Sequence, residues 1–370
     1  MKVLFLSNPI QRDGAPLRLL EIIEYVKSNN RDIAMDVYAD RIAIKNIYSQ
    51  YIDNLYIRDK GEMSLFKRII DKLLSKSGLK KDIIQSIAKN RYDVIYANTV
   101  VQLKKAIEVK KYLPQSKIIL HLRELETVSL LYNRDIFQDI LEVDRVIAIS
   151  KSVYHYVTDV LKVDESKVNL IHSGTHLSKF HNFEKVKNPE IIIGTVGGSA
   201  WRKGFDLFVQ TARIVCKKNP NVKFQWVGNI NKNEKLIYEA DIRKLDLCEN
   251  IEIIDSTDDM ISLMKNWFVF ASFAREEPLG VSVIEAASLG LPVIAFKKSG
   301  GPEEILEEGG GVLVDYIDNE GFANQIETLV DNPERYDYLS EEIKKISAKY
   351  DISNSLPKIN NVITEMLKNS

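Results

Sequence analysis

The chain has 370 residues, 45% of them hydrophobic, and a formal net charge of −1 at pH 7. This length favours two domains over one, and the composition is typical of a soluble globular protein. A net charge near zero argues against a nucleic-acid partner, because binding a polyanion requires a strong positive field.

Positive charge is concentrated in the first half of the chain. Residues 1–180 carry 29 Lys and Arg against 22 Asp and Glu, so the second half is acidic. A basic first half fits an anionic acceptor, or a surface that carries one. The alternative is an uneven distribution of solvated charges without functional meaning, and the counts alone favour neither.

Cysteine usage and the lengths of the apolar runs indicate the compartment. Cys216 and Cys248 have neither the spacing of a metal site nor that of a disulfide framework, which fits a reducing compartment. The apolar run Val3–Leu6 is too short for a signal peptide, and no run approaches the length of a transmembrane helix. We therefore expect a cytoplasmic protein, either free or at the inner face of the membrane.

The first half alternates buried-strand patterns with helical periodicity, which predicts an α/β domain. The first strand, residues 3–7, leads into a turn-rich loop with a single glycine, Gly14, followed by Ala15. This loop lacks the Gly-x-Gly-x-x-Gly fingerprint of dinucleotide-binding folds. Ser150, after a later strand, is a suitable helix N-cap. Further strands are predicted at residues 35–38, 93–97, 117–120 and 144–150.

Residues 64–89 form a basic amphipathic segment. Peripheral membrane contact is one interpretation, because such a helix can lie in the plane of a bilayer surface. A helix that packs on the sheet of its own domain is the commoner interpretation.

His121 directly follows the predicted strand 117–120. Open α/β sheets bind ligands at the carboxyl ends of their strands, so this side chain is a candidate ligand contact. The alternative is an ordinary hydrogen-bonded loop histidine. Three later histidines, at 172, 176 and 181, are interpreted as structural, because Gly174 breaks any helix that would place the first two on one face.

A second α/β unit is predicted after the polar segment 179–190, which is the candidate linker. Its first strand, residues 191–196, is followed by the loop Gly-Gly-Ser-Ala-Trp-Arg-Lys-Gly and a helix. Glycines allow the backbone to approach a ligand closely, and the adjacent cations Arg202 and Lys203 suit a diphosphate. A solvated Arg-Lys turn would explain the cations but not the order of strand, glycines, cations and helix.

The stretch 270–304 reads as strand, loop, helix, strand and glycine turn. Gly280 precedes an apolar helix, whose first backbone N–H groups form a positive end suited to a phosphate. Glu277 lies in the loop at the mouth of that site, and Glu285 follows about two helical turns later. The two could be solvated charges, but Glu285 has apolar neighbours on both sides.

This constellation resembles the donor-binding motif of the retaining glycosyltransferases of family 4. The Lys203-Gly204 pair resembles the second phosphate site of that family. Many members have an arginine five residues before the lysine, whereas this chain has Gly198 there. The family pattern corresponds here to Glu277, Glu285, Gly290-Leu291-Pro292-Val293, Gly300-Gly301 and Glu303 or Glu304.

The resemblance implies the α/β GT-B fold, in which two Rossmann-like domains face each other across a cleft. Residues 1–182 would form the acceptor-binding domain, together with a C-terminal helix, 351–370, that crosses back to it. Residues 183–350 would form the domain that binds the nucleotide-sugar donor.

The resemblance also implies roles for individual residues. The expected catalytic residues are His121, which would contact the transferred sugar, Glu277, which would hold its hydroxyls, and Lys203, which would neutralise the departing diphosphate. Arg123 and Glu124 are candidate acceptor contacts. The donor-binding residues would be Gly14, Ala15, Arg202, Lys203, Leu279, Gly280, Val281 and Glu285, the last of these on the ribose hydroxyls.

The implied reaction is transfer of a sugar, with retention, from a nucleotide-diphosphate sugar of the UDP or GDP type. The acceptor would be a glycan or a lipid-linked glycan of a bacterial surface polysaccharide. The chain contains no Asp-x-Asp sequence, so we expect no obligatory metal and no cofactor. Two alternatives remain open, a GT-B sugar-nucleotide epimerase and a non-catalytic partner of an active transferase. A dinucleotide oxidoreductase is disfavoured by the missing fingerprint.

Overall fold

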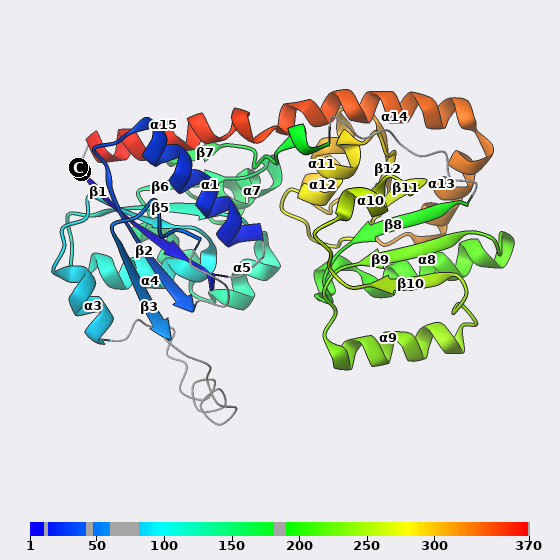
Figure 1. Cartoon of the computed structure of the whole chain (residues 1–370), viewed down its shortest axis with the longest axis horizontal. Coiled ribbons are helices and arrows are strands. Elements are labelled where there is room, and N and C mark those ends of the chain that lie inside the picture. The colour runs from blue at the N-terminus through cyan, green and yellow to red at the C-terminus, as the bar shows by residue number, and fades with distance from the viewer. Residues whose placement is uncertain (11–13, 42–46, 60–80, 181–189, 369–370) are drawn as a thin grey trace. The chain divides into compact units, whose positions relative to one another are not determined.

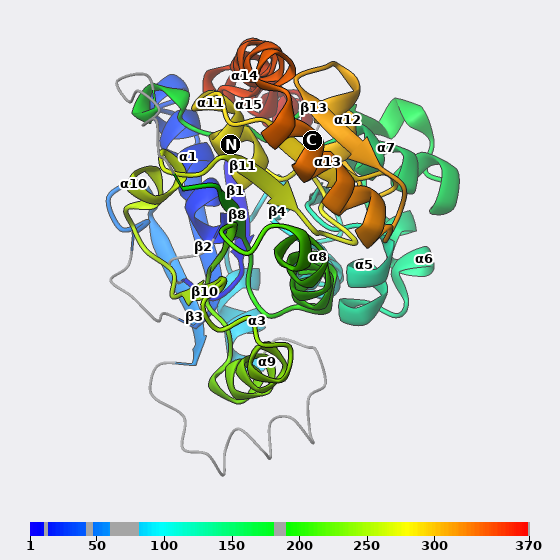
Figure 2. The same ribbon diagram turned by 90° about the vertical axis from the view of Figure 1, so that its right-hand side faces the viewer.

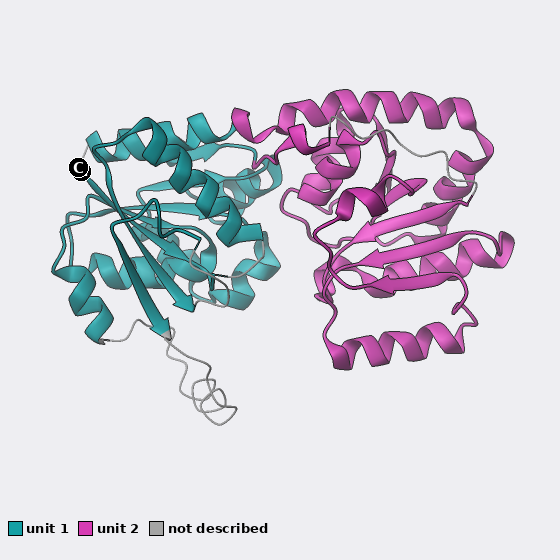
Figure 3. Cartoon of the chain, in the orientation of Figure 1, with its two compact units in different colours: residues 1–172, 355–370 teal, residues 173–354 magenta. Residues whose placement is uncertain are grey.

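The computed structural model describes residues 1–10, 14–41, 47–59, 81–180 and 190–368. The chain forms two compact units (Figure 3), Met1–His172 with Ser355–Ser370, called unit 1, and Ser173–Asn354, called unit 2. Each unit is a Rossmann-like α/β domain built on a parallel sheet. The predicted fold class is therefore confirmed.

Several sequence predictions concern segments outside the described residues. They are residues 64–80 of the basic amphipathic segment, His181, most of the candidate linker and the domain boundary between residues 182 and 183. That boundary stays a prediction.

The described part of unit 1 contains a seven-stranded sheet in the order β3-β2-β1-β4-β5-β6-β7 (Figure 1). All neighbouring strands are parallel. The strands β1, β2, β4, β5 and β6 are largely buried, which explains why they read as apolar runs, whereas β3 at the edge is half-buried or exposed. The order reverses between β1 and β4, where open α/β sheets commonly bind their ligands. The strands are β1 (Lys2–Ser7), β2 (Ala34–Arg41), β3 (Asn54–Asp59), β4 (Val94–Ala97), β5 (Lys117–Leu122), β6 (Arg145–Ala148) and β7 (Val168–Leu170).

Helices connect these strands along the chain. Ser150 caps the helix after β6, with its side chain accepting the Val153 N–H at 3.1 Å, as predicted. The α-helices of unit 1 are α1 (Gly14–Asn29), α3 (Lys81–Ala88), α4 (Val100–Lys110), α5 (Glu126–Tyr132), α6 (Ile136–Asp139), α7 (Lys151–His155) and α15 (Leu356–Lys368). Short 3₁₀ segments lie at Ile140–Glu142 and Glu165–Lys167, and a π-helical segment lies at Tyr156–Val160.

The C-terminal helix α15 packs beside α1 (Figure 1), so the two ends of the chain share one core. The side chains of Ile359, Val362 and Ile363 on α15 belong to the same buried cluster as Val3 and Phe5 on β1. Unit 1 is therefore completed by a segment that follows unit 2 in the sequence.

Unit 2 contains, among its described residues, a six-stranded parallel sheet in the order β10-β9-β8-β11-β12-β13. The strands are β8 (Ile192–Val196), β9 (Lys223–Val227), β10 (Ile251–Ile254), β11 (Val269–Ser272), β12 (Val293–Phe296) and β13 (Gly311–Val314).

The helices of unit 2 cover this sheet (Figures 1 and 2). Helix α8 packs against α13, and α11 packs against α14. The α-helices are α8 (Phe205–Lys218), α9 (Lys232–Lys244), α10 (Met260–Met264), α11 (Val281–Ser288), α12 (Gly301–Glu307), α13 (Asn319–Asp331) and α14 (Pro333–Ser347). Short 3₁₀ segments lie at Leu177–Lys179, Trp201–Lys203, Ala348–Tyr350 and Ile352–Asn354. In the described part of the chain, no helix is both long and apolar enough to span a bilayer.

The packing of α15 generates a stability prediction. Ile363 is fully buried, so Ile363→Ala removes apolar contacts and leaves a cavity, a change that typically costs about 2–5 kcal/mol. We expect faster amide hydrogen exchange in α1 and β1 of unit 1, and unchanged exchange in unit 2. Lys358→Ala, at an exposed position of the same helix, is the control. Equal exchange in the two variants would contradict the shared core.

Candidate functional site

The loop after β8 brings two cations to the carboxyl edge of the sheet in unit 2. Arg202 and Lys203 lie in the 3₁₀ segment Trp201–Lys203, and Gly204 follows with φ +73°. A Cβ on Gly204 would lie 2.1 Å from the carbonyl oxygen of Phe273. The glycine is therefore required both by its left-handed backbone and by the close approach of this loop to the end of β11.

Glu277 lies between these two cations. Its Oε2 atom contacts the Lys203 ammonium and lies 3.3 Å from the Arg202 guanidinium Nη1. The Arg275 N–H also donates to the Arg202 carbonyl at 2.7 Å, so the loops after β8 and β11 are joined by backbone as well as charge. We call Arg202, Lys203 and Glu277 the ion cluster.

The Glu277 carboxyl remains ionised in this position. Its side chain is only 15% exposed, and burial acts to raise its pKa. The charges of Lys203 and Arg202 outweigh that effect and hold the pKa below the ordinary value of 4.5. At neutral pH the ion cluster therefore has one negative and two positive charges.

The N-terminus of α11 shares a small pocket with the ion cluster. Gly280 is its N-cap, at φ +87°, and no side chain caps the helix there. The pocket is lined by residues that include Lys203, Glu277 and Ser282. A helix N-terminus carries partial positive charge, so the pocket combines this charge with a lysine ammonium, which is the chemistry required for an anion. Leu279 and Gly280 are themselves buried.

Glu285 lies further along α11 and is half-buried. Its Oε1 atom accepts a hydrogen bond of 3.4 Å from the Thr175 hydroxyl. Thr175 in turn pairs with Asp351 as an isolated parallel bridge. The structure thus places Glu285 against the segment that enters unit 2, while Glu277 is engaged with the cations of the ion cluster.

The sequence-predicted residues of unit 1 gather at the carboxyl ends of β4 and β5. His121 is 1% exposed and lies within β5, which extends to Leu122. Its Nδ1 atom lies 2.5 Å from the Tyr96 hydroxyl and 3.2 Å from the Arg123 Nη2 atom. Burial, and then the charge of Arg123, hold the pKa of His121 well below its ordinary value, so the ring is neutral at pH 7.

Glu124 is engaged with backbone in the part of the chain that the structure describes. Its Oε2 atom accepts the N–H of Val100 at 3.2 Å and the N–H of Arg123 at 3.0 Å. Val100 is the first residue of α4, where a carboxylate is favoured by the positive end of the helix. This contact gives Glu124 a structural role, and its acceptor role stays a prediction.

Gly14 and Ala15 form the start of α1. The Ala15 carbonyl accepts a hydrogen bond of 2.9 Å from the Asn98 amide Nδ2, and Asn98 follows β4 directly. The predicted glycine loop is thereby joined to the strand next to β5. No described atom lies within 4 Å of a Cβ built on Gly14.

Sequence reasoning missed Tyr96 and Asn98. Tyr96 lies inside an apolar strand and looks like an ordinary core residue. Asn98 carried a usable signal, because a polar residue directly after a buried strand of a parallel sheet lies at the ligand-binding edge.

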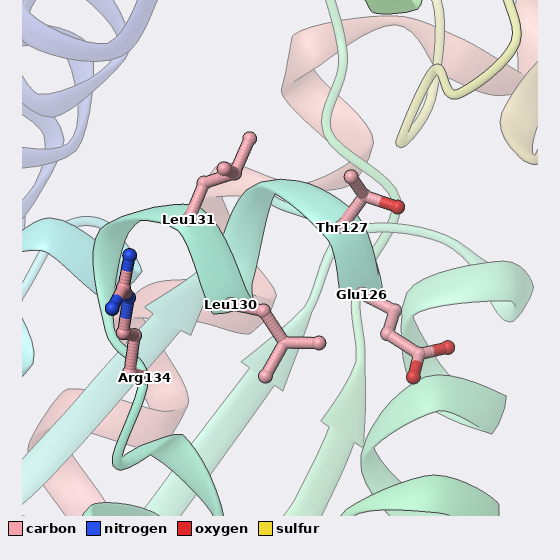
Figure 4. Close-up of a pocket in the computed structure, with 5 residues that line it drawn as sticks. All are labelled: Glu126, Thr127, Leu130, Leu131 and Arg134. Atoms are coloured by element: carbon pink, nitrogen blue, oxygen red, sulfur yellow. The ribbon is translucent and has the colours of Figure 1, made fainter.

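A hollow on α5 of unit 1 was also not predicted (Figure 4). It is lined by Glu126, Thr127, Leu130, Leu131 and Arg134. The side chain of Leu131 is prominent there, with 74% of the residue exposed. A single exposed leucine does not define a ligand, and the hollow has no assigned role.

Comparison with known proteins finds a match to a family model within unit 2. Residues 178–346 match the model of the family described as "Glycosyl transferases group 1". The capsular polysaccharide biosynthesis glycosyltransferase CapM of Staphylococcus aureus is 28% identical over 199 residues, which cover 50% of this chain and 52% of CapM. The O-antigen biosynthesis glycosyltransferase WclY of Escherichia coli is 24% identical over 298 residues, which cover 74% of this chain and 79% of WclY.

The chain spans about half the length, or less, of the first curated relatives it matches. The matches cover 52% of the first relative, 51% of the second and 34% of the third. Solved structures match over the whole of both chains. HepE from Anabaena, in complex with UDP and glucose, has a TM-score of 0.76 at 19% identity. Sucrose-phosphate synthase from Thermosynechococcus elongatus has a TM-score of 0.80 at 16% identity. These likenesses establish a fold of the GT-B type.

The lowered pKa of Glu277 predicts a pH-dependent contribution to stability. A carboxyl whose pKa is lower in the folded state stabilises the fold fully at pH values above its unfolded-state pKa. This stabilisation is lost as the pH falls through the folded-state pKa. Glu277→Gln should therefore lower the free energy of unfolding of unit 2 at pH 7, by roughly 1.5–3 kcal/mol. Unfolding is measured at pH values from 7 to 3. The difference in free energy of unfolding between Glu277→Gln and wild type should decrease once the pH is below 4.5, the ordinary pKa of the carboxyl. A difference that is constant with pH would contradict the ion cluster.

Proposed function

We propose that the chain is a retaining glycosyltransferase of family 4 that moves a sugar from a UDP- or GDP-type nucleotide sugar to a glycan or lipid-linked acceptor. The observation that carries the proposal is the pocket shared by the ion cluster and the N-terminus of α11. The relatives reported above, which act in capsular polysaccharide and O-antigen biosynthesis, support a role in bacterial surface polysaccharide synthesis.

The diphosphate of the donor would bind to Lys203, Arg202 and the first turn of α11. The ion cluster has two cations and one carboxylate, so it keeps a net positive charge for an anion. This charge would stabilise the departing nucleoside diphosphate in the transition state, where negative charge develops on the leaving group. Leu279, Gly280 and Val281 would position the backbone around the phosphate.

Glu277 would have two tasks in this pocket. It holds Lys203 and Arg202 in place, and its ionised carboxylate can accept hydrogen bonds from the hydroxyls of the transferred sugar. Glu285, half-buried on α11, would bind the ribose hydroxyls of the donor. The ionised Glu277 carboxylate would accept a charge-assisted hydrogen bond from a neutral hydroxyl.

The neutral His121 of unit 1 would contact the transferred sugar through its ring, and its backbone carbonyl would support the developing positive charge. Gly14 and Ala15 would lie close to the donor phosphates. Arg123 and Glu124 would contribute to acceptor binding. The predicted domain of residues 1–182, with the C-terminal helix 351–370, would thus serve the acceptor, and residues 183–350 would bind the donor.

Retention would follow from attack of the acceptor on the face from which the diphosphate departs. Because Lys203, Arg202 and a helix N-terminus supply the positive charge, the proposed reaction requires no metal and no cofactor. The proposal also includes a cytoplasmic location. Peripheral contact at the inner face of the membrane, through the basic segment 64–89, is the less common of the two interpretations of that segment.

Removing the ammonium group tests the phosphate site. Lys203→Ala deletes a charge-assisted contact, so we expect UDP and GDP to bind about 10- to 100-fold more weakly in calorimetry. Lys218→Ala is the matched control. Lys218 lies at the exposed end of α8, and the substitution removes its ion pair with Glu327. Unchanged affinity in Lys203→Ala would remove the lysine from the site.

Removing the charge of Glu277 tests the catalytic assignment. Glu277→Gln should lower sugar transfer at least 100-fold, the scale expected for a group that acts in the transition state. The affinity for UDP or GDP should be retained or increased, because a negative charge beside the phosphates is gone. The assay contains a chelator, in which wild type is expected to be fully active. Glu276→Gln, which changes the neighbouring carboxylate, is the control. Normal turnover in Glu277→Gln, or a strict metal requirement, would contradict the mechanism.

A further inference from the structure

The side chain of Arg275 joins the loop after β11 to the chain on both sides of Lys203. Its Nη1 atom donates to the Trp201 carbonyl at 3.1 Å. Both of its Nη atoms also donate to the Asp206 carboxylate, Nη1 to Oδ1 at 2.8 Å and Nη2 to Oδ2 at 2.7 Å. Trp201 precedes Lys203 and Asp206 follows it in the sequence, so one guanidinium spans the segment that carries the ammonium.

The backbone at Arg275 holds the same segment. The Arg275 N–H donates to the Arg202 carbonyl at 2.7 Å, and the Glu276 N–H donates to the same carbonyl at 3.4 Å. The carbonyls at the end of a helical turn have no partner in the helix itself, and in the turn Trp201–Lys203 two of them accept from the loop after β11. The turn has only three residues, so its conformation depends on contacts of this kind rather than on helical propensity.

The bidentate pair joins a buried guanidinium to a more exposed carboxylate. Arg275 is 8% exposed, whereas the side chain of Asp206 is 63% exposed. A buried guanidinium requires an opposite charge beside it, and its planar fork matches both oxygens of a carboxylate, which a lysine cannot do. The hydrogen bonds from Arg275 hold the pKa of Asp206 below its ordinary value, so both groups are charged at neutral pH.

Trp201 contacts the same guanidinium through its ring. The Arg275 Cζ atom lies 5.3 Å from the ring centroid, within the range of a cation–π contact. Trp201 is 58% exposed, whereas Trp226 and Trp267 are fully buried, and the chain has three tryptophans. The fluorescence of the one exposed tryptophan can therefore report on Arg275 in solution.

This contact lies beside the pocket rather than in it. Lys203 and Glu277 are among the residues that line the pocket. Arg275 and Asp206 are not among its lining residues in the described part of the chain. An anion in the pocket would therefore meet Lys203 directly, and Arg275 only through the segment that it holds.

We propose that Arg275 is a positioning residue of the diphosphate site, which holds the turn Trp201–Lys203 so that the Lys203 ammonium stays at the pocket beside Glu277. A lysine side chain is flexible, and a site that orders it before the ligand arrives loses less entropy on binding. Glu277 holds the end of this side chain, and Arg275 holds the backbone from which it starts. The inference rests on the proposed function and deepens it, because it names the residue that supports the proposed phosphate contact.

The first experiment measures the contact in the nucleotide-free, full-length protein. Acrylamide quenching of tryptophan fluorescence acts mainly on Trp201, and Trp201→Phe identifies its share of the signal. Arg275→Met removes the cation and the hydrogen bond to the Trp201 carbonyl, so we expect stronger quenching of Trp201 and a lower emission anisotropy. Arg213→Met, at an exposed position of α8, is the matched control and should behave as wild type. Wild-type quenching and anisotropy in Arg275→Met would overturn the inference and leave the proposed function intact.

The second experiment measures whether Arg275 acts through Lys203. Calorimetry follows UDP and GDP in wild type, Arg275→Lys, Lys203→Ala and the double variant, with Arg213→Lys as the control. Arg275→Lys keeps the charge but loses the fork, so we expect about 10-fold weaker binding, the scale of one charge-assisted hydrogen bond. When Lys203→Ala is already present, the same substitution should change the affinity by less than about twofold, because both residues act on one contact.

The double variant separates positioning from a general structural role. A loss of affinity that is equally large with and without Lys203 would overturn the inference alone, and so would wild-type affinity in Arg275→Lys. Asp206→Asn changes the exposed partner of the pair and should give a smaller loss with the same dependence on Lys203. It decides the matter should the Arg275 variants fail to fold. A wild-type protein that binds neither UDP nor GDP would overturn both the inference and the proposed function.

Discussion

The position of one carboxylate, Glu277, between two cations is the constraint on which the site in unit 2 depends. The cations follow β8 and the carboxylate follows β11, which are neighbours in the sheet. A carboxylate so largely buried is tolerable only with opposite charge beside it, and the cations in turn need a partner to hold them at the edge of the sheet. Each group is therefore held by the others, and Lys203 and Glu277 line the same small pocket as the first turn of α11.

Much of this arrangement can be predicted because a parallel sheet imposes it. Strands that are covered on both faces read as apolar runs, and the residues after them must gather at one edge. The order of strand, glycines, cations and helix around Lys203 carried that information directly. Gly204 has a positive φ, of +73°. This explains why a glycine follows the cations, since no other residue adopts that backbone conformation so readily.

Other features depend on contacts that sequence patterns do not encode. The sequence makes Glu124 a candidate acceptor contact and gives no sign of its partner, which the fold supplies at the first turn of α4. Tyr96 looks like a core residue, but the register of β4 on β5 brings its hydroxyl to His121. In both cases the partner is more than twenty residues away, and only the pairing of strands or helices decides which polar atoms meet.

The two units solve different electrostatic problems. Unit 2 holds formal charges that are partly exposed and carry a surplus of positive charge, which suits a charged diphosphate. Unit 1 holds His121 as a neutral ring, because burial and Arg123 lower its pKa, and Asn98 beside it is neutral as well. Neutral groups of this kind suit an uncharged partner better than an ion. The proposed donor, a nucleotide sugar, has both an anionic diphosphate and uncharged hydroxyls, and the proposal assigns the diphosphate to the positively charged environment of unit 2.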